Sequence, residues 1–179
     1  MNSLAAEAQR YVASSPSRLM PIPQKALDLE NRSVGSNGEP TLAEAYKILK
    51  ERWLNGDRDR ELGLHLMFLA WYGLIEPGHL TGFVVSDELR RELNQLLTEI
   101  HSYFEPQIYQ DAEMLYVVGL AAHMFWFMFD DASAWEKRAS EYRKRYHTLA
   151  PNGIDPATFQ NRGAYCAYYA SQVTVNGGY

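Results

Sequence analysis

The stretch AEMLYVVGLAAHMFWFMF, residues 112–129, decides the fold class. Nearly all of its side chains are apolar, and Glu113 and His123 are its only strongly polar members. A helix that is apolar on every side must be surrounded, either by lipid or by other helices. Aspartates flank the stretch at both ends, without the Lys/Arg asymmetry that is typical of membrane spans. We therefore interpret residues 112–129 as the central helix of a soluble, all-α stack.

An amphipathic helix and a second apolar helix precede this stretch. Thr41 and Glu44 have the spacing of a capping box and predict a helix start at residue 41. Asn55-Gly56 is a typical helix end. The next helix, over residues 60–76, is apolar on every side, and Pro77-Gly78 ends it.

The same alternation continues toward the C-terminus. The amphipathic helix predicted over residues 86–105 ends at Pro106 and precedes the central stretch. A third amphipathic helix, over residues 133–150, precedes a last helix that starts at Asp155-Pro156. The amphipathic helices begin at regular spacing, which predicts three antiparallel helix hairpins stacked with the second in the middle.

The domain organisation follows from composition. Residues 1–40 form an irregular N-terminal arm, in which a short helix over residues 3–13 is followed by segments rich in Ser, Pro and Gly. Apolar residues such as Leu29 predict that the arm lies against the body. Residues 41–174 form one helical-repeat domain, and residues 175–179 form a tail.

The helical pattern resembles that of tetratricopeptide (TPR) repeats. The run AEAYKILKERWLNGD followed by an apolar helix is similar to the second helix of one repeat leading into the next. The segment from AEMLYVVGLAAHMF to YRKRYHTLAP is similar to a whole repeat, with a mid-helix Gly119 and a closing Pro151. The resemblance implies a TPR-like or HEAT-like array of helices that binds other proteins through one face.

Charge and composition exclude several function classes. The net charge of −5 disfavours nucleic acid and anionic membrane surfaces as partners. The single cysteine, Cys166, excludes internal disulfides and cysteine-based zinc sites. Phosphate-binding loops and catalytic motifs are absent from the sequence, so no cofactor and no metal site is predicted. The N-terminus lacks the apolar core of a secretory signal, and we expect a cytoplasmic protein.

These features predict a small protein–protein interaction module without catalytic chemistry, of the adaptor or bacterial immunity type. The loop over residues 76–85 is long and apolar, and either folds onto the stack or contacts a partner. Basic residues on the 133–150 helix form either a solvated outer face, which is the favoured interpretation, or a positive stripe for an acidic partner surface. The candidate contact residues are Lys50, Arg90, Arg91, Asn94 and Arg143 on the amphipathic helices and His79, Leu80 and Phe83 in the loop.

Two alternatives remain open. His65 and His123 both lie within apolar helices and would form a pocket for an enzyme or a small ligand if they met, although a core histidine is the favoured interpretation of each. The protein would instead be a self-associating structural protein if one of the tyrosines of the last helix were exposed at the end of the stack and formed a homodimer contact.

Overall fold

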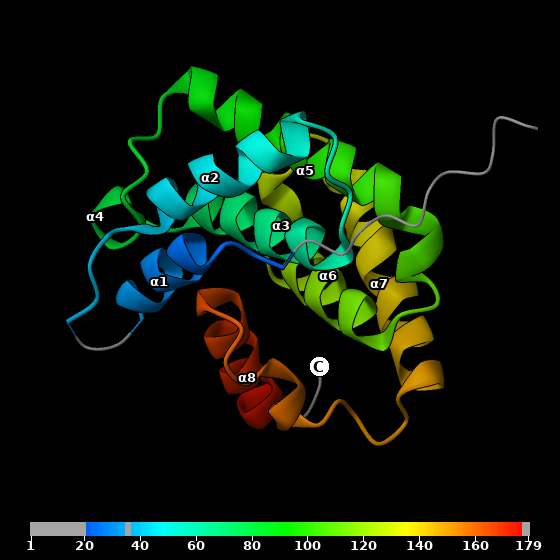
Figure 1. Ribbon diagram of the computed structural model, residues 1–179. Coiled ribbons are helices and arrows are strands. Elements are labelled where there is room, and N and C mark those ends of the chain that lie inside the picture. The colour runs from blue at the N-terminus through cyan, green and yellow to red at the C-terminus, as the bar shows by residue number, and fades with distance from the viewer. Residues whose placement is uncertain (1–20, 35–36, 177–179) are drawn as a thin grey trace, which may run out of the picture.

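Helices dominate the chain in the computed structural model, which describes residues 21–34 and 37–176 (Figure 1). No strand occurs within these residues, which confirms the all-α prediction. The predicted helix over residues 3–13 lies outside the described residues. The α-helices are α1 (Gln24–Arg32), α2 (Leu42–Leu54), α3 (Arg60–Ile75), α4 (Gly78–Thr81), α5 (Asp87–Ile108), α6 (Ala112–Phe125), α7 (Ala132–Leu149) and α8 (Ala164–Asn176). Two 3₁₀ helices, η2 (Trp126–Met128) and η3 (Pro156–Phe159), follow α6 and α7.

Short polar side chains define where four of these helices begin. Asp59 accepts a hydrogen bond from the Glu61 N–H at the start of α3, and Asp111 accepts one from Met114 N–H at the start of α6. Ser86 and Asp131 cap α5 and α7 in the same way. Each cap satisfies an N–H group that lacks a partner inside its helix. The cap at Asp131 starts α7 at Ala132, one residue before the predicted start at residue 133.

Helix α3 lies at the centre of the molecule. It packs against α2, α5, α6 and α8, and the side chains from Leu62 to Trp71 are all buried. Helix α6 packs mainly against α7 and reaches α3 on one side. The sequence prediction instead placed residues 112–129 at the centre, as part of the middle hairpin. Both α3 and α6 are apolar on every side, and this apolar character does not say which of the two helices has more neighbours.

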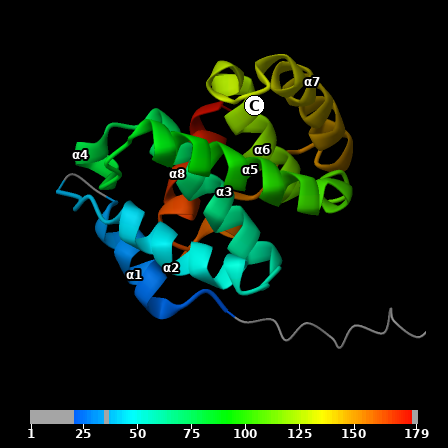
Figure 2. The same cartoon turned by 90° about the horizontal axis from the view of Figure 1, so that it is seen from above.

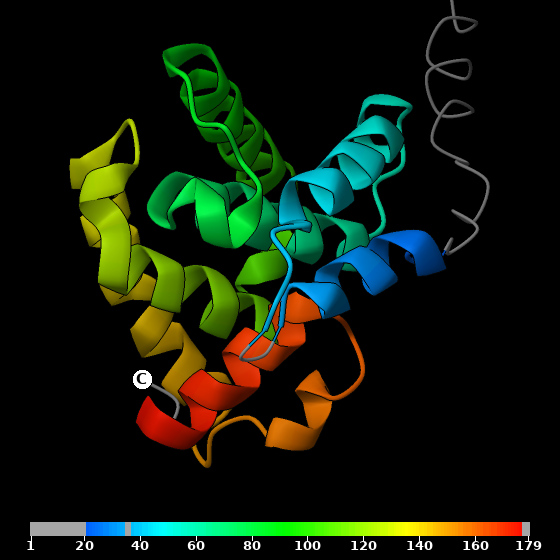
Figure 3. The same cartoon turned by 90° about the vertical axis from the view of Figure 1, so that its left-hand side faces the viewer.

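The helices pair differently from the predicted hairpins. Helices α2 and α3 pack together as predicted, but α5 packs on α3 more extensively than on α6, and α6 packs on α7. The segment between α7 and α8 then carries α8 to the far side of α3, where its N-terminal end meets the C-terminal end of α1 (Figure 3). An apolar helix face requires a neighbour without specifying which one, so the sequence pattern left the pairing undetermined.

Helix α1 corrects the prediction of an irregular arm. Residues 24–32 form a regular helix that packs on α2 and α8, with Ala26, Leu29 and Glu30 buried. The predicted burial of Leu29 is confirmed. The capping box predicted at Thr41 is wrong, because the Thr41 hydroxyl donates a hydrogen bond to the carbonyl oxygen of Leu29, 2.5 Å away. That bond ties the start of α2 to α1.

The apolar stretch at 112–129 is not one helix. Helix α6 ends at Phe125, a 3₁₀ turn follows, and Phe129 is buried in extended conformation. The side chains of Met124 and Phe127 are exposed. The stretch is longer than the part of α6 that its neighbours cover, so its last turn reaches solvent.

Other helix ends also differ from prediction. Pro106 lies within the last turn of α5, and the helix continues to the buried Ile108 although a proline removes one backbone hydrogen bond. The last helix starts at Ala164, since Asp155-Pro156 begins only the short η3. Leu149, the last residue of α7, is exposed.

Candidate functional site

A cluster of charged side chains lies between α1, α3, α6 and α8, and we call it the ionic cluster. Its members come from four separate parts of the chain. Each makes at least one ion pair with another member. They are Glu30, Arg60, Glu61, His65, Asp111, Glu113 and Arg162.

The Glu30–His65 pair is the most deeply buried part of the ionic cluster. Both side chains are fully excluded from solvent, and His65 Nδ1 lies 2.8 Å from Glu30 Oε1. On the other side of the ring, His65 Nε2 lies 3.4 Å from Glu61 Oε1, an electrostatic contact without good hydrogen-bond geometry. The imidazole is therefore held between two carboxylates, which favours its charged form.

Arginines neutralise the remaining carboxylates. Arg162 Nε donates to Glu61 Oε1 at 2.7 Å, and Arg162 Nη1 lies 2.8 Å from Glu113 Oε1. The Tyr165 hydroxyl donates to the same Glu113 oxygen at 2.6 Å. Arg60 bridges the other Glu113 oxygen, at 2.8 Å, to Asp111. Glu113 thus accepts bonds from three donors that come from α3, α8 and the segment before α8.

The electrostatics of the ionic cluster keep its histidine charged. Burial alone would lower the pKa of His65, but the charge and hydrogen bond of Glu30, together with Glu61, raise it to about 9. Burial alone would raise the pKa of Glu61, but its contacts with His65 and Arg162 lower that pKa to about 2. At neutral pH both groups are ionised, so the cluster consists of ion pairs rather than neutral hydrogen bonds.

Gly163 allows α8 to approach the buried pair closely. Its φ of +87° is a left-handed conformation that favours glycine, and a β-carbon at this position would overlap Glu30 Oε2. The backbone before α8 therefore passes directly over the Glu30 carboxylate.

The ionic cluster connects four helices through ion pairs between their side chains. Its carboxylates pair with cations, and its histidine is closed to solvent. No three His, Cys, Asp or Glu side chains in the described residues are arranged to hold a metal ion. The cluster thereby fixes α1, α3 and α8 relative to one another.

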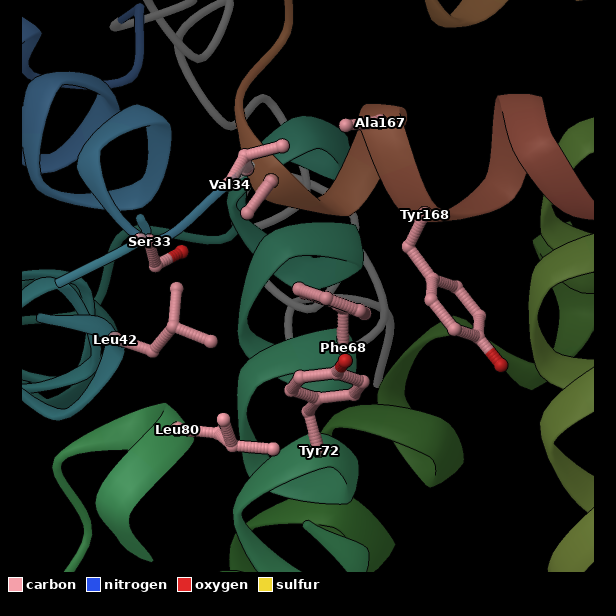
Figure 4. Close-up of a pocket in the computed structure, with 10 residues that line it drawn as sticks. Ser33, Val34, Leu42, Phe68, Tyr72, Leu80, Ala167 and Tyr168 are labelled. Atoms are coloured by element: carbon pink, nitrogen blue, oxygen red, sulfur yellow. The ribbon is translucent and has the colours of Figure 1, made fainter. Parts of the chain in front are cut away.

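An open groove lies beside the ionic cluster, between α3, α4, α8 and the connection from α1 to α2 (Figure 4). Its volume is about 360 Å³, and every side chain that lines it is uncharged. Phe68 and Tyr72 project from α3, Leu80 lies to one side and Tyr168 of α8 to the other. The lining residues are Ser33, Val34, Gly38, Leu42, Phe68, Tyr72, Leu80, Ala164, Ala167 and Tyr168.

The predicted loop residues divide between this groove and the core. Leu80, on the short α4, is 52% exposed and lines the groove, and His79 beside it is exposed. Phe83, predicted as a contact residue, is 3% exposed, because Gly73 leaves room for its ring and Tyr46 packs against its other side. Phe83 thus belongs to the core, and the loop folds back in part.

The predicted polar contact residues do not form one surface. Asn94 is buried next to Leu93, so its prediction as a contact residue is wrong. Lys50 pairs with Glu92 at 2.7 Å and joins α2 to α5, while Arg90 and Arg91 are exposed on α5. Arg143 is exposed on α7, which lies at the opposite end of the molecule from α4 (Figure 2).

His65 and His123 do not meet. His65 lies in the ionic cluster close to the first turn of α6, where Glu113 is located. His123 is exposed ten positions further along α6, roughly 15 Å away along the helix axis. The pocket that the enzyme alternative required from this pair is therefore not formed.

The sequence contained one signal for the ionic cluster. Glu113 is a charged residue at the start of an otherwise apolar helix, a position that the helix dipole alone also favours. Its partners Arg60 and Arg162 lie about 50 positions away on either side, at separations that no local pattern connects.

Comparison with protein-family models, with curated proteins and with solved structures found no match. Among the described residues, no helix combines the length and the apolar character that crossing a bilayer requires.

Proposed function

We propose that this protein is a non-catalytic binding module that holds a segment of another protein in the groove between α3, α4 and α8. The observation that carries the proposal is the groove itself, with its uncharged lining and its exposed Leu80. Partly exposed leucine and tyrosine side chains around a groove are typical of a protein contact surface. An adaptor or immunity role, a TPR-like mode of binding and a cytoplasmic location belong to the same proposal.

The ionic cluster supports this function because it makes the groove rigid. The groove walls come from the α1–α2 connection, α3 and α8, and Glu30, His65 and Arg162 tie these elements together. A preformed groove loses less conformational entropy when a partner binds than a flexible one does.

A pair of matched variants tests the proposal. Leu80→Asp places a charge in the groove, whereas Val84→Asp places one at an exposed position of the same loop that does not line the groove. In affinity capture from a native lysate, we expect a stoichiometric partner that binds the natural chain and Val84→Asp but not Leu80→Asp. Circular dichroism should show that both variants remain folded, because both side chains are exposed.

Two results would contradict the proposal. One is the absence of any stoichiometric partner. The other is a partner that Leu80→Asp still binds as tightly as Val84→Asp does.

Self-association is a second candidate, supported by a different observation. Phe127 is 57% exposed beside the exposed Met124, at the end of α6. Sedimentation of the natural chain and of Phe127→Ser tests this candidate, which requires a dimer that the substitution dissociates.

A further inference from the structure

At the junction of α3 and α4 the groove lies next to the carboxylate of Glu76, which is not one of its lining residues. Glu76 follows Tyr72 by one helical turn, and its N–H donates to the Tyr72 carbonyl oxygen at 2.9 Å. Glu76 is the C-cap residue of α3, in extended conformation, and lies one turn beyond Tyr72. Burial, followed by the charge of Glu76, raises the pKa of Tyr72, and the same charge adds to the raised pKa of Tyr168. The carboxylate is therefore close to both tyrosines.

Glu76 lacks a cationic partner within residues 21–34 and 37–176. Its side chain is half-buried, and none of the ion pairs among these residues includes it.

The aromatic rings beside Glu76 also favour a cation. Phe68 and Tyr72 stack with ring centres 5.0 Å apart, and the Tyr168 ring lies edge-on to Tyr72 at 5.7 Å. The faces of aromatic rings carry partial negative charge and attract ammonium and guanidinium groups. An amine or guanidine at this end of the groove would meet both a ring face and a carboxylate.

We propose that the groove recognises a segment in which an apolar side chain adjoins a lysine or arginine. The apolar side chain lies against the exposed Val34 and Leu80, and the cation lies near Glu76 and the partly exposed Tyr72 and Tyr168. The net charge of −5 favours such a basic segment over an acidic one. This inference rests on the proposed function and specifies the chemistry of the partner. It replaces the acidic partner that the basic residues of α7, on the far side of the molecule, had suggested.

Selection from a displayed library of short random peptides tests this specificity. The full chain is the bait, and the Leu80→Asp chain serves for counter-selection. We expect the enriched peptides to combine apolar residues with a neighbouring lysine or arginine. Enriched peptides that lack basic residues would overturn the inference but leave the groove as a binding site. Failure to enrich any peptide over the Leu80→Asp chain would contradict the proposed function itself.

Titration calorimetry with one enriched peptide then locates the cation. Replacing its lysine by norleucine removes the charge and keeps the aliphatic stem, and Glu76→Gln removes the carboxylate. We expect each change to weaken binding roughly 5-fold, and the two together to weaken it little further, since both remove the same partly exposed contact. Glu136→Gln, which removes an equal charge from exposed α7, should leave the affinity unchanged. Equal affinities of Glu76→Gln and the natural chain would contradict the assignment of Glu76.

Discussion

Single residues decide how closely the helices approach at the ionic cluster. Gly163 places the backbone before α8 over the buried Glu30 carboxylate, and the side chain of His65 compensates the charge of that carboxylate from below. Neither feature tolerates an added atom or a lost charge, because both groups are fully buried.

Gly163→Ala should destabilise the fold more than Gly56→Ala does. Both glycines have φ near +90°, but a β-carbon at Gly56 meets open space, whereas one at Gly163 overlaps Glu30 Oε2. We expect a loss of about 1 kcal/mol for Gly56→Ala from backbone strain alone. The loss for Gly163→Ala should be roughly 2–4 kcal/mol, because steric overlap adds to the strain. Urea unfolding measures both, and equal losses would show that the approach of Gly163 to Glu30 is looser than described.

Replacing His65 by leucine should cost roughly 3–5 kcal/mol of unfolding free energy, because it leaves Glu30 as a buried charge without a partner. The double variant Glu30→Leu/His65→Leu removes both charges and should be more stable than His65→Leu alone. Chemical denaturation of the two variants makes the comparison. A double variant less stable than the single one would mean that Glu30 is compensated by another group.

At the scale of elements, the sequence predicted most helices and missed their partners. The starts of α3 and α5 are close to prediction because Asp59 and Ser86 are strong caps. Helix α1 was missed because Pro21, Pro23 and the Ser- and Gly-rich segment around it are typical of irregular structure. The packing of α6 on α7 could not be predicted, because an apolar surface lacks the directional contacts that would identify a neighbour.

The same reasoning explains what could be predicted of the candidate site. Leu80 was identified because an apolar residue in a loop stands out from its surroundings. Phe68 and Tyr72 were not, because they lie in a helix that is apolar throughout, and no local pattern shows that α4 and α8 leave an open groove beside them. Phe83 has the same sequence character as Leu80, and only the space left by Gly73 explains its burial.

Hydrogen exchange should rank the helices by their burial. We expect the slowest amide exchange in α3 and in the first part of α6, whose side chains are almost all buried. The single-turn α4 should exchange faster by several orders of magnitude, because it has few internal hydrogen bonds. Mass spectrometry of peptic fragments gives the order, and protection of α4 equal to that of α3 would contradict it.

At the scale of the whole molecule, two buried histidines make stability depend on pH in opposite directions. The pKa of His65 is raised from 6.5 to about 9, so the stability it contributes is present below about pH 6.5 and is lost as the pH rises through 9. Burial, and then the charge of Arg138, lowers the pKa of His101 to about 4. Its contribution is present above pH 6.5 and is lost as the pH falls toward 4.

The urea midpoint should therefore be highest near pH 6.5 and fall on both sides. The alkaline loss should reach about 2–3 kcal/mol by pH 9. Unfolding curves collected across this range in constant salt measure it. The His65→Leu variant should lose the alkaline slope and keep the acidic one, in which the neutral His101 is bonded to Tyr142. An unchanged alkaline slope in that variant would assign the effect to other groups.

The position of Arg162 has a consequence for how the chain folds during synthesis. Its partner Glu61 leaves the ribosome 101 residues earlier, and Glu113 also precedes it. Until Arg162 emerges, these two carboxylates lack the guanidinium that joins them. Contacts between distant parts of a chain form late and slow folding. A nascent chain halted before Arg162 should thus be a good substrate for chaperones and proteases, and release of the following segment should end that vulnerability.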